Sequence, residues 1–258
     1  MWLRRPIKPV QPADKKATLG SVSIMNLAGL QKTSLIDYPG RVSCVVFVTG
    51  CNFTCPFCHN GELARGEWPS RLPLDRFIEF LTPRRKLLDG VVISGGEPTL
   101  HPHLADLCRA VRRLHLRIKL DTNGSRPDVL ARLFDERLVD YVAMDIKTPI
   151  ASYHPALVHE DITAHLRRSI QLIMQTSPDY EFRTTCVRPF VDAQRILDMA
   201  RAIQGARRYV LQSFRPQKML QPDFFETIEP VISPAEIHHF RELSSPLVEN
   251  CVIRTEHD

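Results

Sequence analysis

Three cysteines in one short stretch are the residues of this sequence best suited to chemistry. Cys51, Cys55 and Cys58 lie in GCNFTCPFCHN with the spacing Cys-x3-Cys-x2-Cys. Thiolates are soft ligands that suit iron-sulfur clusters and zinc. A cubane cluster held by only three thiolates leaves one iron open to another donor. The spacing therefore indicates a metal centre with an open coordination position.

Two other interpretations of the cysteines remain open from their spacing alone. A closed zinc site needs a fourth ligand, which His59, His101 or His103 could supply. The thiols could also be free or paired in disulfides, with no metal role. Four further cysteines are isolated in the sequence, and because isolated free cysteine is among the most buried residue types we expect them in the core. They are Cys44, Cys108, Cys186 and Cys251.

The elements that must position these cysteines follow from the periodicity of apolar residues. Short β-branched runs alternate with stretches of helical period, which predicts parallel strands joined by crossover helices. The expected strands are 42–49, 91–94, 117–120, 141–146, 180–187 and 208–213. The expected helices between them are 72–81, 102–114, 127–138, 161–175 and 192–204. A strand-like stretch at 23–30 precedes these units, and a helix at 233–243, capped by Ser233, follows them.

Two loops of this pattern carry candidate ligand-binding residues. Gly95, Gly96 and Glu97 follow the second strand, and paired glycines let a backbone approach a ligand closely, although tight turns are their default use. The sequence DTNG at 121–124 follows the third strand, and Asn-Gly by itself is an ordinary turn signal. Because right-handed crossovers bring the carboxyl ends of parallel strands to one rim, both loops should face the cysteines.

Polar side chains also mark the last three strands. Asp145 and Lys147 share one face at the end of the fourth strand, and a solvated ion pair is the alternative to a ligand site. Arg183 in the fifth strand is a planar bidentate donor for a carboxylate, with a surface salt bridge as the alternative. Gln212 lies near the end of the sixth strand.

The cysteine motif, with the aromatic Phe57 directly before its last cysteine, resembles the signature of the radical S-adenosylmethionine (SAM) superfamily. The resemblance covers about residues 24–212. It implies an α/β fold, a partial (β/α)6 barrel of the TIM type. It also implies two cofactors, a [4Fe-4S] cluster on the three cysteines and SAM on the open iron.

The same resemblance implies roles for the loops. Gly95-Gly96-Glu97-Pro98 resembles the motif that receives the methionine amino group of SAM, with Glu97 as the acceptor. DTNG together with DIK at 145–147 resembles the branch that activates glycyl radical enzymes, in which equivalent positions contact SAM or a monovalent cation. Arg183 resembles the arginine that meets the methionine carboxylate. The implied cofactor-binding residues are Phe57, His59, Gly95, Gly96, Glu97, Asp121, Asn123, Asp145, Lys147, Arg183 and Gln212. The implied cation ligands are Asp121, Thr122 and Asp145.

One departure concerns the adenine end of the cofactor. Gln212 is placed to border the adenine, but the histidine of some relatives is replaced here by Ser213-Phe214-Arg215. The adenine contacts therefore do not follow from the resemblance.

Residues 27–60 resemble the start of the activating proteins of anaerobic ribonucleoside-triphosphate reductase. This resemblance implies a protein substrate, a glycine of a glycyl radical enzyme whose alpha hydrogen is taken by a 5'-deoxyadenosyl radical. A low-potential electron donor would reduce the cluster. A radical SAM enzyme acting on a small metabolite, and a zinc-binding module without turnover, are the alternatives.

Composition limits the class of protein further. With 258 residues, 43% of them hydrophobic, the chain can bury a substantial core, and we expect a basic tail at 1–20 and one domain at 21–258. Seven cysteines without a spaced, even framework favour the reducing cytoplasm. The net charge of +5 is scattered and does not favour nucleic acid, and no apolar run is long enough to span a membrane.

Overall fold

The computed structural model describes residues 26–254 of the chain, so the predicted tail at 1–20 lies outside the described residues. All six expected strands are present and parallel to one another. They are β3 (Ser43–Val48), β5 (Gly90–Gly95), β6 (Arg117–Thr122), β7 (Tyr141–Asp145), β8 (Tyr180–Cys186) and β9 (Tyr209–Ser213). The prediction of a parallel strand-helix repeat is confirmed.

Two further strands complete an eight-stranded sheet in the order β10-β9-β8-β7-β6-β5-β3-β2. β2 (Gly29–Ser34) pairs antiparallel with β3 at one edge, and β10 (Cys251–Arg254) pairs parallel with β9 at the other. The expected single strand at 23–30 was wrong in its bounds. The structure has a short β1 (Asn26–Leu27), paired with β4 (Leu72–Pro73), and then β2.

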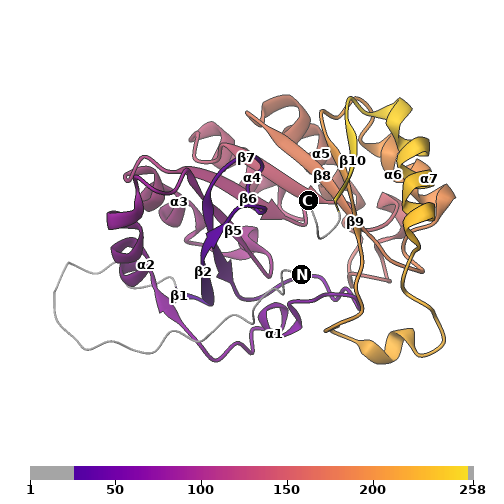
Figure 1. Cartoon of the computed structure of the whole chain (residues 1–258), viewed down its shortest axis with the longest axis horizontal. Coiled ribbons are helices and arrows are strands. Elements are labelled where there is room, and N and C mark those ends of the chain that lie inside the picture. Colours follow the sequence, from indigo (N-terminus) through magenta and orange to yellow (C-terminus); the bar gives the residue numbers. More distant parts are fainter. Residues whose placement is uncertain (1–25, 255–258) are drawn as a thin grey trace.

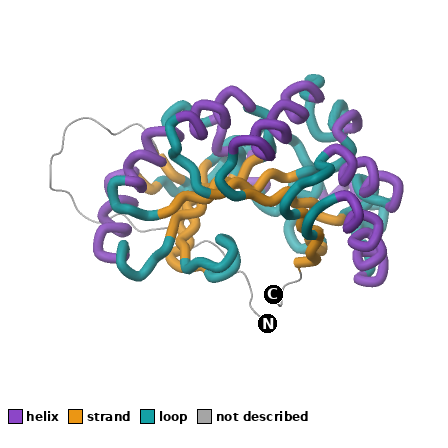
Figure 2. The backbone as a smooth tube through the Cα atoms, turned by 90° about the horizontal axis from the view of Figure 1, so that it is seen from above, coloured by secondary structure: helices purple, strands orange, loops and turns teal. Residues whose placement is uncertain are grey.

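The helices cover the convex face of the sheet, and the strands line the concave face of an open arch (Figure 2). They are α1 (Gly61–Ala64), α2 (Leu74–Leu81), α3 (Leu104–Arg112), α4 (Pro127–Asp135), α5 (Thr163–Thr176), α6 (Ala193–Ala202) and α7 (Pro234–Ser244). Ser233 caps α7 as predicted, and Glu236 completes a capping box with it. No described helix combines the length and apolar character that crossing a membrane requires. The arch is the partial (β/α)6 barrel expected from the sequence.

The two faces of each strand differ in character. On β6, Ile118 and Leu120 are fully buried and belong to the main hydrophobic core. Lys119 and Asp121, one residue out of phase, form an ion pair instead. Side chains on a strand alternate between faces, so this pair lies on the face opposite the core. The concave interior of the barrel is therefore partly polar.

The third strand is longer than predicted. β6 continues through Thr122 because Asp121 pairs with Ala143 and Thr122 with Met144 on β7. Asp121 is therefore held on a rigid strand, and only Asn123 and Gly124 belong to the loop that follows.

Candidate active site

The cysteine loop leaves the carboxyl end of β3 and leads into α1, at the lower side of the view in Figure 1. Cys55 is buried, and Cys51 and Cys58 are partly exposed. The backbone N–H of Phe53 donates to the Cys51 Sγ over 3.4 Å. Burial raises the pKa of Cys51 to about 11 and that of Cys55 to about 12. The thiols are therefore protonated at neutral pH until a metal displaces the protons.

The loop after β5 is in direct backbone contact with the start of the cysteine loop. A Cβ atom on Gly96 would lie 2.0 Å from the carbonyl oxygen of Gly50, and the Glu97 N–H donates to that oxygen over 2.8 Å. Gly95 has a φ of +121°, and a Cβ there would lie 2.3 Å from the Val48 oxygen. Both glycines are thus required by contact between two backbones, which is more than an ordinary turn demands.

Glu97 joins the same loop to the end of β6. Its side chain is 1% exposed, and its carboxylate accepts hydrogen bonds from Thr99 N–H (3.0 Å), Thr99 Oγ1 (2.5 Å), Thr122 Oγ1 (2.8 Å) and Asn123 N–H (2.6 Å). All four donors belong to the protein. The structure therefore gives Glu97 a linking role between loops, and its role as acceptor of a ligand amino group stays a prediction.

Asn123 fastens the end of β6 to the cysteine loop. Its Nδ2 donates to Asn52 Oδ1 over 3.0 Å and lies 3.9 Å from the Cys51 Sγ, and its Oδ1 accepts from the Ser125 N–H. The side chain is 5% exposed. Three loops that are distant in sequence are thereby held against one another at one rim, which we call the mouth.

A row of charged side chains lies below the mouth inside the barrel. Lys119 Nζ is 2.5 Å from Asp121 Oδ1, and Arg183 Nη1 is 3.4 Å from the same oxygen. Arg183 Nε donates to Asp145 Oδ1 over 2.8 Å, and Lys147 Nζ lies 3.2 Å from Asp145 Oδ2. Burial by itself would raise the pKa of Asp121, but Arg183 and Lys119 outweigh it and hold the pKa at about 2. Both carboxylates are therefore ionised at neutral pH.

The exposure of these charged side chains bears on the two alternatives left open for Asp145 and Arg183. The side chains of Lys147 and Arg183 are only 18% and 12% exposed. The surface salt bridge at Arg183 is therefore wrong, and the ion pair of Lys147 with Asp145, whose side chain is 31% exposed, is only partly solvated. The charge of Lys147 is also felt by the thiols, where it opposes the effect of burial on the pKa of Cys55.

Phe57, His59 and Gln212 lie on the side of the mouth nearest β9. Phe57 is 6% exposed and packs against Phe190, with ring centroids 5.2 Å apart. The His59 ring stacks on Phe214 at 5.4 Å, and its Nε2 lies 2.8 Å from the Arg215 carbonyl oxygen. Gln212 is partly buried on β9. In the structure Phe57 and His59 fix the cysteine loop to the segment after β9, and their contact with a cofactor stays a prediction.

Two of the three histidines that could complete a zinc site have other partners in the structure. His59 is engaged with the segment after β9, and His103 lies 3.3 Å from Asp106. The isolated cysteines are mostly core residues as predicted, since Cys44, Cys108 and Cys186 are fully buried. Cys251 is only partly buried against the core.

Known proteins similar in sequence show the family of this chain. Residues 45–173 match the model of the radical SAM superfamily. A Methanocaldococcus jannaschii protein described as a "putative glycyl-radical enzyme activating enzyme" is 32% identical over 238 residues, which are 89% of this chain and 95% of that protein. The chain belongs to the radical SAM superfamily. It is a radical SAM enzyme, and members of this superfamily use a [4Fe-4S] cluster and SAM.

Other relatives share a shorter part of this radical SAM chain. A pyruvate formate-lyase-activating enzyme of Staphylococcus aureus is 31% identical, and a 7-carboxy-7-deazaguanine synthase of Hyperthermus butylicus is 32% identical. Each match covers 47% of this chain and about half of the relative, 53% and 52% respectively.

Solved structures agree on the fold. A radical SAM methyltransferase from Sphaerobacter thermophilus has a TM-score of 0.63 at 17% identity, over 88% of this chain and 70% of that one. Streptococcus suis SuiB bound to SAM has a TM-score of 0.61 at 15% identity, over 81% and 48%. At such identities the likeness concerns the fold alone.

The described residues fit the two cofactors of the superfamily. Three free thiols, the soft ligands that an iron-sulfur cluster takes, lie on one short loop. The glycine pair beside them leaves a backbone cradle that a Cβ would fill. Cys51, Cys55 and Cys58 would hold the cluster, and Gly95 and Gly96 would border SAM.

The monovalent cation implied by the resemblance does not fit in the same way. Asp121 and Asp145 are each paired with two cationic side chains, and the Thr122 hydroxyl donates to Glu97. A further cation would have to displace an ammonium or a guanidinium. In this structure Lys119 supplies the positive charge at Asp121, and the monovalent-cation site stays a prediction.

Lys119→Met should make the protein dependent on an added monovalent cation. Lys119 is 1% exposed, and breaking a buried pair costs ~3–5 kcal/mol because one charge is left uncompensated. We expect the melting temperature of the variant to be higher in potassium chloride than in choline chloride at equal ionic strength. The wild type and Lys119→Arg should show no difference. A wild type that itself melts earlier in choline would contradict this role of Lys119.

Lowering the pH should remove the stability that the ion pairs of Asp121 contribute to the folded protein. Because its folded pKa is depressed to about 2, its contribution to stability is complete above the unfolded pKa, ~3.9, and is lost as pH falls through about 2. The unfolding free energy of wild type minus that of Asp121→Asn should be constant above ~pH 5 and shrink by about 2 kcal/mol toward pH 2. Urea unfolding at a series of pH values measures this difference, and a flat difference would rule the effect out.

Three further residues belong to the site but were not predicted from the sequence: Lys119, Ser94 and Asn52. Ser94 Oγ donates to Asp121 Oδ2 over 3.0 Å, and Asn52 accepts from Asn123. For Lys119 the signal was present, since a lysine two residues before Asp121 shares its face of a strand. Asn52 carried no such signal, because its role depends on the meeting of two loops.

Proposed function

We propose that this protein is a radical SAM activase that takes the alpha hydrogen from a glycine of a partner enzyme, the anaerobic ribonucleoside-triphosphate reductase. The observation that carries the proposal is similarity over 95% of the length of the archaeal relative described as an activating enzyme of glycyl radical enzymes. The segment at 27–60, with its DYPG leader, supports the choice of partner.

The small size of the described chain also supports a protein substrate. Between β9 and residue 254 the only cysteine is Cys251, which packs against the core. A second iron-sulfur cluster usually needs four thiolates, so this part of the described chain offers no auxiliary cluster.

The charged row suggests how this chain orients SAM. Lys147 and Arg183 both bind Asp145, and both could exchange this carboxylate for the methionine carboxylate of the cofactor. Asp121 would keep Arg183 in place, because Lys119 leaves it only partly neutralised. When bound, the cluster and SAM supply a 5'-deoxyadenosyl radical that takes hydrogen from the substrate. A low-potential donor supplies the electron, and the reducing cytoplasm keeps the cysteines available.

Electron paramagnetic resonance tests the proposal directly. The anaerobically reconstituted protein is reduced and mixed with SAM and the reductase from the same organism. We expect a glycyl radical signal on the reductase, with one 5'-deoxyadenosine formed per radical, and no radical when the C-terminal glycine of the reductase is replaced by alanine. SAM cleavage without a radical on the reductase would reject this partner. A [4Fe-4S]+ signal that does not change when SAM is added would reject binding of SAM to the open iron.

A further inference from the structure

We propose a second ligand site, for a nucleoside phosphate, at the base of the barrel. A cavity of about 310 Å³ opens there, at the amino ends of the strands. Arg117, Tyr141 and Tyr180 are the first residues of β6, β7 and β8, and all three line it. The cysteines leave the opposite end of β3, so this cavity is separate from the mouth. Its volume is at the lower end of the range of small-molecule pockets, ~300–1,000 Å³.

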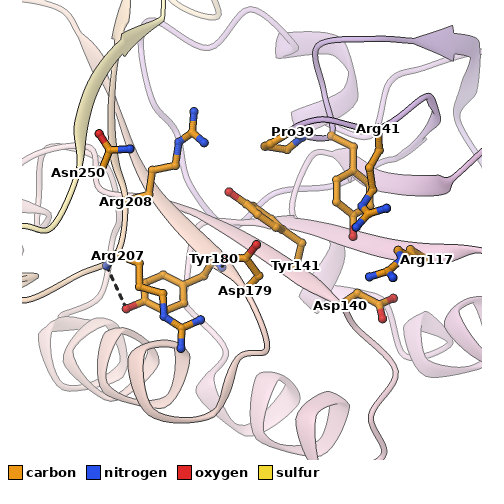
Figure 3. Close-up of a pocket in the computed structure, with 11 residues that line it drawn as sticks. Pro39, Arg41, Arg117, Asp140, Tyr141, Asp179, Tyr180, Arg207, Arg208 and Asn250 are labelled. Atoms are coloured by element: carbon orange, nitrogen blue, oxygen red, sulfur yellow. Dashed lines mark hydrogen bonds between the residues drawn. The ribbon is translucent and has the colours of Figure 1, made fainter.

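The lining of this cavity, which we call the basal pocket, is rich in arginine. Arg41 and Arg117 lie on one side and Arg207 and Arg208 on the other, with Tyr141 between them (Figure 3). Guanidinium groups present planar, bidentate donors that match phosphate. Four of them in one small cavity form a site for an anion with several oxygens.

Most of these arginines lack a carboxylate partner. Neither Arg41 nor Arg117 forms an ion pair within 4 Å with a carboxylate of residues 26–254, and Arg41 only covers the Tyr38 ring at 5.6 Å. The Nε of Arg208 is buried without a hydrogen-bond partner, and Glu181 Oε2 lies 3.8 Å from it. A buried donor without a partner is costly, and a ligand oxygen would satisfy it.

The two aspartates of the basal pocket do not cancel this charge. Asp140 is already bound by Arg112, whose Nη1 lies 3.0 Å from Oδ1, and by the Ile118 N–H at 2.8 Å. Among the described residues, the Asp179 carboxylate accepts a hydrogen bond only from the N–H of its neighbour Tyr180. A carboxylate in that position can accept a hydrogen bond from a sugar hydroxyl, as acidic residues do for ribose in dinucleotide sites.

The tyrosines of the basal pocket pack against other side chains and do not present open ring faces. Tyr38, Tyr141 and Tyr180 are 2%, 5% and 3% exposed, and the Tyr38 and Tyr141 ring centroids are 5.7 Å apart. The groups left to bind a ligand are the arginines, which suit phosphate, and the Asp179 carboxylate, which suits a sugar hydroxyl. Together they favour a nucleoside phosphate over inorganic phosphate.

Isothermal titration calorimetry on the full chain tests this site, with ATP, dATP, AMP, inorganic phosphate and a poly-glutamate peptide as separate probes. We expect the nucleotides to bind one per chain and inorganic phosphate to bind at least about tenfold more weakly. Arg41→Ala and Arg117→Ala should each weaken nucleotide binding by about tenfold or more, because each removes charged hydrogen bonds. Neither has a carboxylate partner among the described residues, so their removal should leave the fold intact.

The matched control is Arg132→Ala, an exposed arginine on α4 outside the basal pocket. It should bind nucleotide like the wild type. No nucleotide binding by the wild type, equal binding of phosphate or poly-glutamate, or equal loss in Arg132→Ala would each overturn the proposal. The assay needs neither cluster nor SAM, so it stands or fails independently of the activase reaction.

Discussion

Cys55→Ala should lose the iron-sulfur cluster and with it SAM cleavage. Cys55 is one of only three thiols on the cysteine loop and is 6% exposed, so no other described cysteine can take its place. Changing even an outer partner of a metal ligand costs ~10–100-fold in metal affinity or activity, so loss of the ligand itself should exceed about 100-fold. Iron content and 5'-deoxyadenosine formation after anaerobic reconstitution measure the effect.

Cys251→Ala is the control for this variant. Cys251 is also a free thiol, and it is partly buried, but it lies on β10 and packs against the core. It should keep both iron and SAM cleavage. If Cys55→Ala retained full cofactor cleavage, the assignment of the cluster to this loop would be rejected.

Gly96→Ala should disrupt the mouth as a whole. The added Cβ would lie 2.0 Å from the Gly50 oxygen and 2.7 Å from the Gly50 carbon, and neither backbone atom can rotate away as a side chain can. The loops must then part, which breaks the hydrogen bond from Glu97 N–H to Gly50. We expect a loss of ~1–3 kcal/mol or more in unfolding free energy, as for overpacked sites, and a SAM affinity reduced by about tenfold or more.

Gly205→Ala separates this clash from the general cost of replacing glycine. Gly205 has a φ of +80°, but nothing lies within 4 Å of its Cβ position. Its substitution should cost only the left-handed backbone strain, ~1–2 kcal/mol, and should leave SAM affinity unchanged. Calorimetric unfolding and equilibrium SAM binding compare the two variants. Equal SAM affinities in Gly96→Ala and wild type would show that contact between the loops does not shape the SAM site.

The local sequence determined which elements exist and which residues stand at the mouth. The β-branched runs and helical periods identified all six parallel strands, because a buried strand needs little beyond such a run and a turn at each end. The Cys51-x3-Cys55-x2-Cys58 spacing and Gly95-Gly96 identified the mouth for the same reason, since each motif lies within one short segment.

Tertiary structure decided what depends on contacts between distant segments. β10 is only four residues long and is a strand because it pairs with β9. Glu97 is a link between loops because Thr122 and Asn123 arrive from β6, and Asn52 matters because Asn123 meets it. The arginines that line the basal pocket come from segments as distant as residues 41 and 208. Sequence periodicity acts over a few residues, whereas these roles depend on which strand ends become neighbours in the folded barrel.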